Sequence, residues 1–439
     1  MMGERTVMQE SLFYGFRLED HVPADHLLRR IDRFVDLTDL RAYLARFYSS
    51  TGRPSIDSEL MLRMLIVGYC YGIRSERRLC EEVHLNLAYR WFCRLGLEGS
   101  VPDHSTFSKN RHGRFAESNV FRRLFETVVG RCMAEGLVGG EGFAVDASLI
   151  EADANRQRGA PGAEWSPPES ASRSVREYLA VLNEEAWGRV TDVVPKFISP
   201  ADPAAQWTGA MRGPAFFAYA DNYLIDLKAA VIVDVEASRA IRQAEVGAAK
   251  TMIERTAERF GLKPQRLAGD TAYGSAEMLN WLVEEQIAPH IPVIDKSGRR
   301  DGTFAREEFR YDETTDTYTC PGGKPLTTSG TLVNDGATLL YRAGKTDCSR
   351  CQLKPQCCPN TPVRRVPRSL YERARDLTRS LAGTPAFEQS RRERKRVEML
   401  FAHLKRILRL GRLRLRGPCG ARDEFLLAAT AQNLRSSQN

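Results

Sequence analysis

The sequence lacks any run of 18 consecutive apolar residues, which excludes a membrane-spanning helix of ordinary length. Its first residues, MMGERTVMQE, lack the apolar core of a secretory signal peptide. It also shows no internal repeat, which argues against a solenoid or a propeller. We therefore expect a globular protein of the cytoplasm, with no membrane partner.

What the chain does contain is material for a large core and an uneven distribution of charge. At 439 residues, with 42% hydrophobic and 27% charged residues, it is long enough for two or three domains. Residues 361–439 hold 19 Lys and Arg against 7 Asp and Glu, so the net charge of +8 is a property of the C-terminal part. Such a segment suits a partner with a phosphate backbone. A solvated basic helix face is the plainer alternative.

The N-terminal part reads as a series of short helices. "DSELMLRMLIVGYCYG" predicts one from about Asp57 to Gly72, and a second runs from its cap at Ser75 to Gly96. Another begins after Pro102. We expect residues 1–136 to form a helical, helix-turn-helix-like DNA-binding domain, although helical packing alone would give the same pattern. The basic residues expected to be exposed for DNA contact are Arg74, Arg77, Arg78, Lys109, Arg111 and Arg114.

From residue 141 the pattern changes to strands that alternate with helices, which predicts a mixed α/β fold. The strands are "EGFAVD", "NYLIDL", "AAVIVDVEA", "QRLAGD" and "PHIPVID", and a long helix capped at Ser238 and closed by Gly261 follows the third. We expect the core in two parts. These are residues 141–295, with a partly flexible excursion over 156–215, and 385–439, separated by a Cys-rich insertion over 296–384.

Three acids stand at informative places in this order. Asp146 ends the first strand, Asp270 ends the fourth, and Glu398 lies in the last long basic helix. Carboxylates from neighbouring strand ends and a covering helix can form an oxygen-rich cage for Mg²⁺. An Asp after a strand is also a common helix cap, so position alone does not select these acids.

The helix that holds Glu398 gives a more specific pattern. Arg394, Glu398 and Lys405 are spaced to lie along one line at the border of an apolar stripe. The carboxylate could reach a metal ion while the two cations hold phosphates. Simple i,i+4 pairing between Arg394 and Glu398 is the alternative.

This spacing, R-x3-E-x6-K, resembles the signature of bacterial insertion-sequence transposases of the DDE class, Tyr-x2-Arg-x3-Glu-x6-Lys. "FAVDASLIEADAN" is similar to their first-aspartate motif, and "AGDTAYGS" is similar to the second, with Tyr273 three residues after the aspartate. "RPSIDSELMLRMLIVGYCYGIRSERRLCEEV" and "PDHSTFSKNR" resemble their N-terminal domain. The chain departs from the signature at its tyrosine, where Arg391 stands.

The resemblance implies an RNase H-like core in which Asp146, Asp270 and Glu398 bind two Mg²⁺ or Mn²⁺ ions. The enzyme would hydrolyse a strand at the element's end and use the freed 3′-hydroxyl to attack target DNA. Arg394 and Lys405, with Tyr273 and Arg391, would contact DNA, and the enzyme would act in the nucleoid as a homodimer or larger assembly on paired ends. A nuclease without strand transfer and a non-catalytic DNA-binding protein are the alternatives.

The cysteines predict a second metal site. Five of the ten crowd into 39 residues: Cys320, then Cys348 and Cys351 as C-x2-C, then Cys357 and Cys358. Four thiolates suit a structural Zn²⁺, and we take Cys357 as the fourth ligand, although the spacing does not distinguish it from Cys358. Free thiols and a disulfide are the alternatives.

Overall fold

The computed structural model describes residues 15–49, 51, 55–182, 184, 187, 194–209, 213–294, 301–334 and 336–436. The chain divides into two compact units. The first comprises Met1–Gly139, Ala147–Gly261 and Val397–Asn439, and the second comprises Gly140–Asp146 and Leu262–Arg396. The stretch MMGERTVMQE and Asp295, the end of the last predicted strand, lie outside the described residues.

The first unit begins with a helical region. Helix α4 is buried on nearly all sides because most of its residues are apolar, and it forms the centre of this region. The helices are α1 Leu18–His21, α2 Leu27–Phe34, α3 Thr38–Ala45, α4 Ser58–Cys70, α5 Glu76–Leu85, α6 Leu87–Phe92, α7 His104–Asn110, α8 Ala116–Ser118 and α9 Val120–Ala134, with a π-helical turn at Arg111–Phe115.

The single helix predicted from Ser75 to Gly96 is wrong, because the structure has two helices there. Ser75 caps α5 as expected. Asn86 then adopts an extended backbone, and its side chain accepts hydrogen bonds from the backbone N–H groups of Ala88 and Tyr89 to begin α6. Asn competes with the backbone inside a helix and favours its N-terminus. The continuous apolar pattern of the flanking segments concealed this break.

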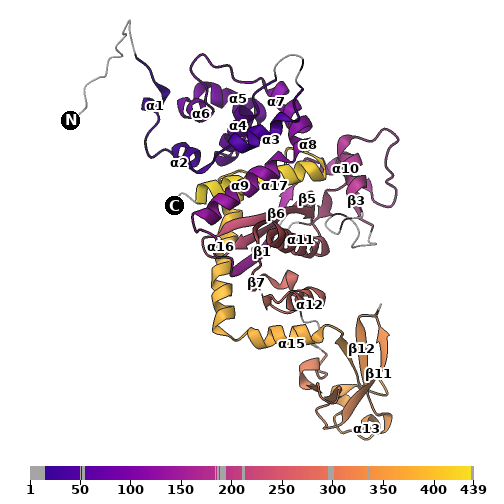
Figure 1. Ribbon diagram of the computed structural model, residues 1–439. Helices are drawn as coiled ribbons and strands as arrows, with labels where there is room; N and C mark the ends of the chain where they lie inside the picture. Colours follow the sequence, from indigo (N-terminus) through magenta and orange to yellow (C-terminus); the bar gives the residue numbers. More distant parts are fainter. Residues whose placement is uncertain are drawn as a thin grey trace, which may run out of the picture. The chain divides into compact units, whose positions relative to one another are not determined.

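The first unit also contains an antiparallel set of strands and two long helices. β4 Gln206–Thr208, β5 Phe216–Asp226 and β6 Val231–Arg239 pair in that order. Helix α11 Arg242–Phe260 packs on β5 and β6, and helix α17 Gly417–Ser436 packs on α4, α9 and β6 (Figure 1). Helix α17 is buried along nearly its whole length, so the C-terminus of the chain completes the core of this unit.

The predicted cap of the long helix is also wrong. Ser238 lies within β6, and α11 begins only after Ile241. Asn222 on β5 donates from Nδ2 to Ser238 Oγ at 2.9 Å, so the hydroxyl is satisfied inside the sheet and the strand continues past it. The other end agrees with the sequence, because Gly261 ends α11 in the left-handed conformation with φ 65°.

The excursion over residues 156–215 forms short elements in its described part. These are a 3₁₀ turn at Arg156–Arg158, β2 Ala160–Pro161, α10 Arg173–Val181, β3 Phe197–Ile198 and β4. β2 pairs with β3, and α10 packs on α17. This segment therefore joins the core of the first unit at α17 and, through β4, at β5.

The second unit contains a parallel set of strands. β1 Gly142–Glu151 begins in this unit and continues into the first; its opening residues pair in parallel with β7 Arg266–Ala268, which pairs in parallel with β8 Ala288–His290. α12 Ala276–Glu284 joins β7 to β8, and α15 Glu372–Leu381 packs on α12 and β8. Helix α16 Pro385–Arg406 then runs without interruption from the second unit into the first.

The Cys-rich segment of the second unit forms its own small antiparallel sheet, in the order β13-β12-β11-β10-β9 (Figure 1). Its core is small and centred on aromatic side chains, among them Phe309, Tyr318 and Tyr341. The elements are β9 Arg310–Asp312, β10 Thr317–Thr319, β11 Pro325–Val333, β12 Thr338–Ala343 and β13 Arg365–Ser369, with α13 Lys345–Ser349 and α14 Lys354–Cys357 between the last two strands.

Within the described residues, no helix combines the length and the apolarity that crossing a bilayer requires.

Candidate active site

Asp146 and Asp270 occupy matching positions on two adjacent parallel strands. β1 and β7 pair with Ala144 opposite Ala268, and the same offset two residues further places Asp146 opposite Asp270, just beyond the end of β7. Asp270 keeps an extended backbone, with φ −85° and ψ 179°. Neighbouring strands lie about 4.8 Å apart, and side chains two residues apart share a face. The two predicted acids therefore lie side by side at the carboxyl edge of the parallel strands.

Asp270 also caps a helix, which is the alternative role that an Asp after a strand commonly has. Its Oδ1 accepts a hydrogen bond from the backbone N–H of Ala272 at 2.8 Å and begins the short 3₁₀ helix Thr271–Tyr273. The cap uses one carboxylate oxygen and orients the other. A capping role and a metal-binding role are therefore compatible at this residue.

A cation accompanies Asp146 on the same edge. Arg394 Nη1 lies 3.7 Å from Asp146 Oδ2, and the Asp146 side chain is 19% exposed. The preceding residue on α16, Glu393, pairs with Arg266 of β7 at 3.0 Å. Two consecutive residues of the helix are thus attached to the two strands that carry the acids.

Close packing surrounds Gly269, the residue that precedes Asp270. A Cβ at Gly269 would lie 3.3 Å from Cγ2 of Val145 and from Cγ1 of Ile291, so a larger residue would require these side chains to shift. Tyr273 is 2% exposed and packs against the same point. In this structure its ring contributes to the packing, and its contact with DNA stays a prediction.

Glu398 lies on helix α16 one turn after Arg394, on the same helical face. The apolar stripe predicted for this helix is confirmed, because Val397, Leu400, Phe401 and Leu404 are all buried. The Glu398 side chain itself is exposed. The pattern expected from the sequence, an acid at the border of a buried stripe, is present.

Lys405 has an acidic neighbour that sequence reasoning missed. Asp221 of β5 is fully buried, and burial raises its pKa well above the usual range while Lys405 acts to lower it. Burial lowers the pKa of Lys405, and Asp221 opposes that fall. Phe401, one turn earlier on α16, stacks on Tyr223 of β5 with ring centroids 4.9 Å apart. No sequence signal distinguished Asp221, because it precedes the predicted strand.

Arg391 stands at the position of the signature tyrosine. Its guanidinium is exposed and pairs with Glu388 on the same helix at 2.7 Å. The preceding residue, Ser390, is fully buried, and its hydroxyl lies 2.7 Å from Nδ1 of His290 on β8. Arg391 is therefore available to a ligand, while its neighbour attaches the helix to the parallel strands.

Asp153, which lies near the end of the first-aspartate motif, is explained by ion pairs. It pairs with Arg412 at 3.2 Å and with Arg416 at 3.0 Å within the first unit. These contacts attach the segment after β1 to the loop that precedes α17.

Two of the basic residues expected to be exposed for DNA contact are buried, so that part of the prediction is wrong. Arg74 pairs with Glu424 of α17, and its guanidinium lies 4.3 Å from the ring centroid of Tyr69. Arg111 is 5% exposed and pairs with Glu76 at 3.3 Å. Both arginines hold helices together, a use of charge that helical periodicity alone does not reveal.

The five clustered cysteines line one cavity of about 30 Å³ in the second unit. Burial and the neighbouring Cys358 thiol raise the pKa of Cys357 to about 11, and the same causes raise the pKa of Cys348. None of the five is in a disulfide. Among the residues that the structure describes, no three His, Cys, Asp or Glu side chains already converge as a bound metal ion requires.

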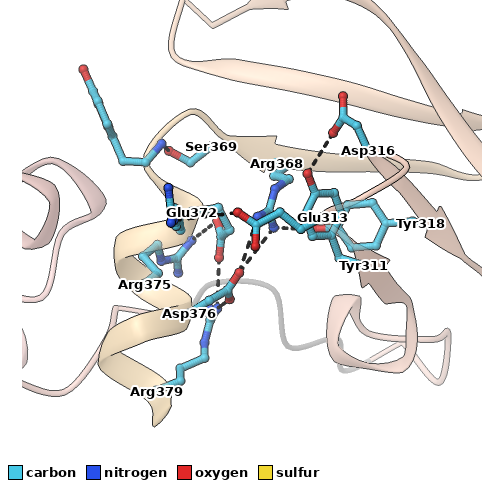
Figure 2. Close-up of polar contacts among 12 residues, drawn as sticks. Tyr311, Glu313, Asp316, Tyr318, Arg368, Ser369, Glu372, Arg375, Asp376 and Arg379 are labelled. Carbon is cyan, nitrogen blue, oxygen red and sulfur yellow. Dashed lines mark hydrogen bonds and ion pairs between the residues drawn. The ribbon is translucent and has the colours of Figure 1, made fainter. Parts of the chain in front are cut away.

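A network of charged and aromatic side chains holds the small sheet on α15 (Figure 2). Glu372 pairs with Arg375 and Arg379, each at 3.0 Å, and with Arg306. Burial raises the pKa of Glu372, but these guanidinium groups outweigh it and hold the pKa at about 2. Arg368 of β13 lies 3.6 Å above the ring of Tyr311 of β9 and pairs with Asp376 of α15 at 3.4 Å, so it connects the sheet to the helix.

Comparisons with known proteins identify the class. Residues 16–113 match a model described as "Transposase domain (DUF772)", and residues 319–436 match a "Transposase DDE domain". The structure is also similar to that of a piggyBac transposase in a synaptic complex with hairpin DNA, at 10% identity and a TM-score of 0.32, over 94% of this chain and 73% of that one.

The two family matches define a transposase, an enzyme that acts on DNA. Both matched regions are transposase domains, and the second is a domain of the DDE class, in agreement with the insertion-sequence resemblance of the motifs. Glu398, Arg394 and Lys405 lie within the second match, whereas Asp146 and Asp270 lie between the two.

Proposed function

We propose that this transposase cuts a DNA strand at the end of its element and joins the freed 3′-hydroxyl to target DNA, using Asp146, Asp270 and Glu398 as ligands of two Mg²⁺ or Mn²⁺ ions. The observation that carries the proposal is the parallel register of β1 and β7, which aligns Asp146 with Asp270. Two carboxylates side by side repel each other, and a cation between them removes that repulsion.

An RNase H-like core is part of the proposal. Along the chain, β1 is followed by the antiparallel β5 and β6, then α11, the parallel β7, α12, the parallel β8 and finally the helix with Glu398. This is the order of elements in that fold, with the small Cys-rich sheet inserted before the last helix.

The donor set suits a hard divalent cation. Mg²⁺ and Mn²⁺ prefer carboxylate oxygens, which Asp146 and Asp270 offer from rigid strand ends. When bound, two such ions activate a water molecule or a 3′-hydroxyl and stabilise the leaving oxygen of the phosphodiester. Glu398 would complete the set, because it follows Arg394 by one turn and Arg394 is already paired with Asp146.

The cations of α16 would position the DNA. Arg394 neutralises Asp146 in the free protein, and its planar guanidinium can turn to a phosphate once a metal ion takes over that role. Lys405, supported by the neighbouring Asp221, and the exposed Arg391 would contact the backbone further along the helix. These contacts carry no sequence information and would hold any strand in place.

Recognition of the element's ends is assigned to the N-terminal helices. Arg77 and Arg78 on α5 are exposed, unlike Arg74 and Arg111, and they present positive charge where α5 begins. A dimer or larger assembly in the nucleoid would bring two ends together, as joining of both ends to one target requires.

The test is an incubation of the purified chain with DNA that carries the sequences flanking its reading frame, together with Mg²⁺ or Mn²⁺ and a supercoiled target. The expected products are end fragments joined covalently to the target, formed only with the divalent ion. Nicked ends without joined products would favour a nuclease, and a shifted but uncut band would favour a non-catalytic DNA-binding protein. Scrambled flanking DNA is the matched control.

A further inference from the structure

The cysteine cavity brings together thiols from three separate segments of the second unit. Cys320 comes from the turn after β10, Cys348 and Cys351 come from α13 and the turn that follows, and Cys358 follows α14 directly. All of them, with Cys357, line the same cavity. Segments that lie far apart in the sequence therefore bring their cysteine side chains to one cavity.

The turn at Cys320 is folded around its sulfur. The backbone N–H of Lys324 donates to Cys320 Sγ at 3.3 Å, and the N–H of Cys320 donates to the carbonyl of Lys324 at 2.9 Å. A Cβ at Gly322 would lie 3.7 Å from Cys320 Sγ and 3.6 Å from Cys351 Sγ. The two sulfurs therefore both lie beside Gly322, and the N–H group supports negative charge on Cys320.

Cys348, Cys357 and Cys358 also line this cavity, and all three are buried. The carbonyl of Cys357 accepts from Arg364 Nη1 at 2.9 Å, which anchors the end of α14 beside the cavity. The two adjacent cysteines therefore both offer a thiol to the site.

We propose that Cys320, Cys348, Cys351 and one of the adjacent Cys357 and Cys358 bind one structural Zn²⁺ ion. Four thiolates fill the tetrahedral shell of zinc and leave no position for a substrate. The other cysteine of the adjacent pair lines the cavity without binding the ion.

A structural metal ion would stabilise the small sheet, because the apolar core of this sheet is small. Its buried apolar core outside the cysteines is limited to a few residues, Phe309, Tyr318, Leu326, Tyr341, Ala343 and Val366. Small cores of this kind supply only a few kcal/mol, so natural proteins add a metal ion or disulfides to them. The ion would join α13 and α14 to the β10–β11 turn at the end of the sheet.

The proposal is tested by zinc content and by cobalt substitution on the full chain, independently of any DNA reaction. Wild-type protein purified without chelators is expected to contain one zinc per chain and to show the visible absorption of tetrahedral cobalt–thiolate when loaded with Co²⁺. Cys348→Ser is expected to lose both signals. Of Cys357→Ser and Cys358→Ser, one is expected to lose them and the other to keep them.

Cys70→Ser, a fully buried cysteine in α4 of the first unit, is the matched control and is expected to keep one zinc. Far-ultraviolet circular dichroism reports whether each variant is folded. Less than half an equivalent of zinc in the wild type would overturn the site. Full retention of zinc in both Cys357→Ser and Cys358→Ser would overturn the assignment of the fourth ligand to that pair.

Discussion

Replacing Asp270 by Asn is expected to lower the rates of DNA cleavage and joining by about 10³-fold or more, because a ligand of the proposed metal site loses its charge. Asn keeps the oxygen that accepts from the N–H of Ala272, so the cap of the 3₁₀ helix survives. Binding of end DNA and the thermal unfolding midpoint are expected to stay close to those of the wild type. Rates of single-turnover cleavage and of joining measure the effect.

Asp312→Asn is the matched control for this variant. Asp312 also accepts a backbone hydrogen bond from the residue two positions later, Thr314, at 3.0 Å, but it is exposed at the end of β9 in the small sheet. The Asp312→Asn variant is expected to cleave and join DNA at the wild-type rate. Full activity in Asp270→Asn would remove Asp270 from the metal site and leave it with its capping role alone.

Replacing Glu398 by Gln is expected to lower joining by about 10²- to 10³-fold while end binding is retained. Glu398 is exposed on α16, so the change costs little folding stability. Arg394, one turn earlier, keeps its ion pair with Asp146. The loss would therefore report a missing metal ligand and not a displaced helix.

Glu388→Gln on the same helix serves as its control, because Glu388 forms only a surface ion pair with Arg391 at 2.7 Å. It is expected to change joining by less than about twofold. If both glutamine variants join at equal rates, Glu398 is a solvated acid on the helix and the i,i+4 alternative considered from the sequence is correct.

The order of the core strands and helices, and the choice of three candidate carboxylates, could be predicted from the sequence because both depend on local patterns. Strand periodicity and the resemblance to known motifs indicated Asp146 and Asp270 as candidates, and helical spacing indicated Glu398. The register of β1 against β7 could not be read from spacing, since it depends on pairing between residues more than 120 positions apart. Only the structure places Asp146 opposite Asp270.

The predictions that were wrong failed because long-range contacts outweighed the local sequence patterns. Arg74 and Arg111 look like exposed cations in a helical pattern, yet partners on α17 and α5 bury them. Ser238 looks like a helix cap, yet Asn222 satisfies it inside the sheet. Asp221 gave no signal, because a buried acid within a strand has meaning only once its neighbours are known.

The most direct test of the paired-carboxylate metal site is the joining rate of Asp146→Cys in Mg²⁺ and in Mn²⁺. A thiolate is a poor ligand for the hard Mg²⁺ ion and a better one for Mn²⁺, so the ion at this position determines the outcome. We predict that the variant loses joining in Mg²⁺ and recovers part of it in Mn²⁺, relative to the wild type in the same ions. Wild-type joining by Asp146→Cys in Mg²⁺ would contradict metal binding at Asp146.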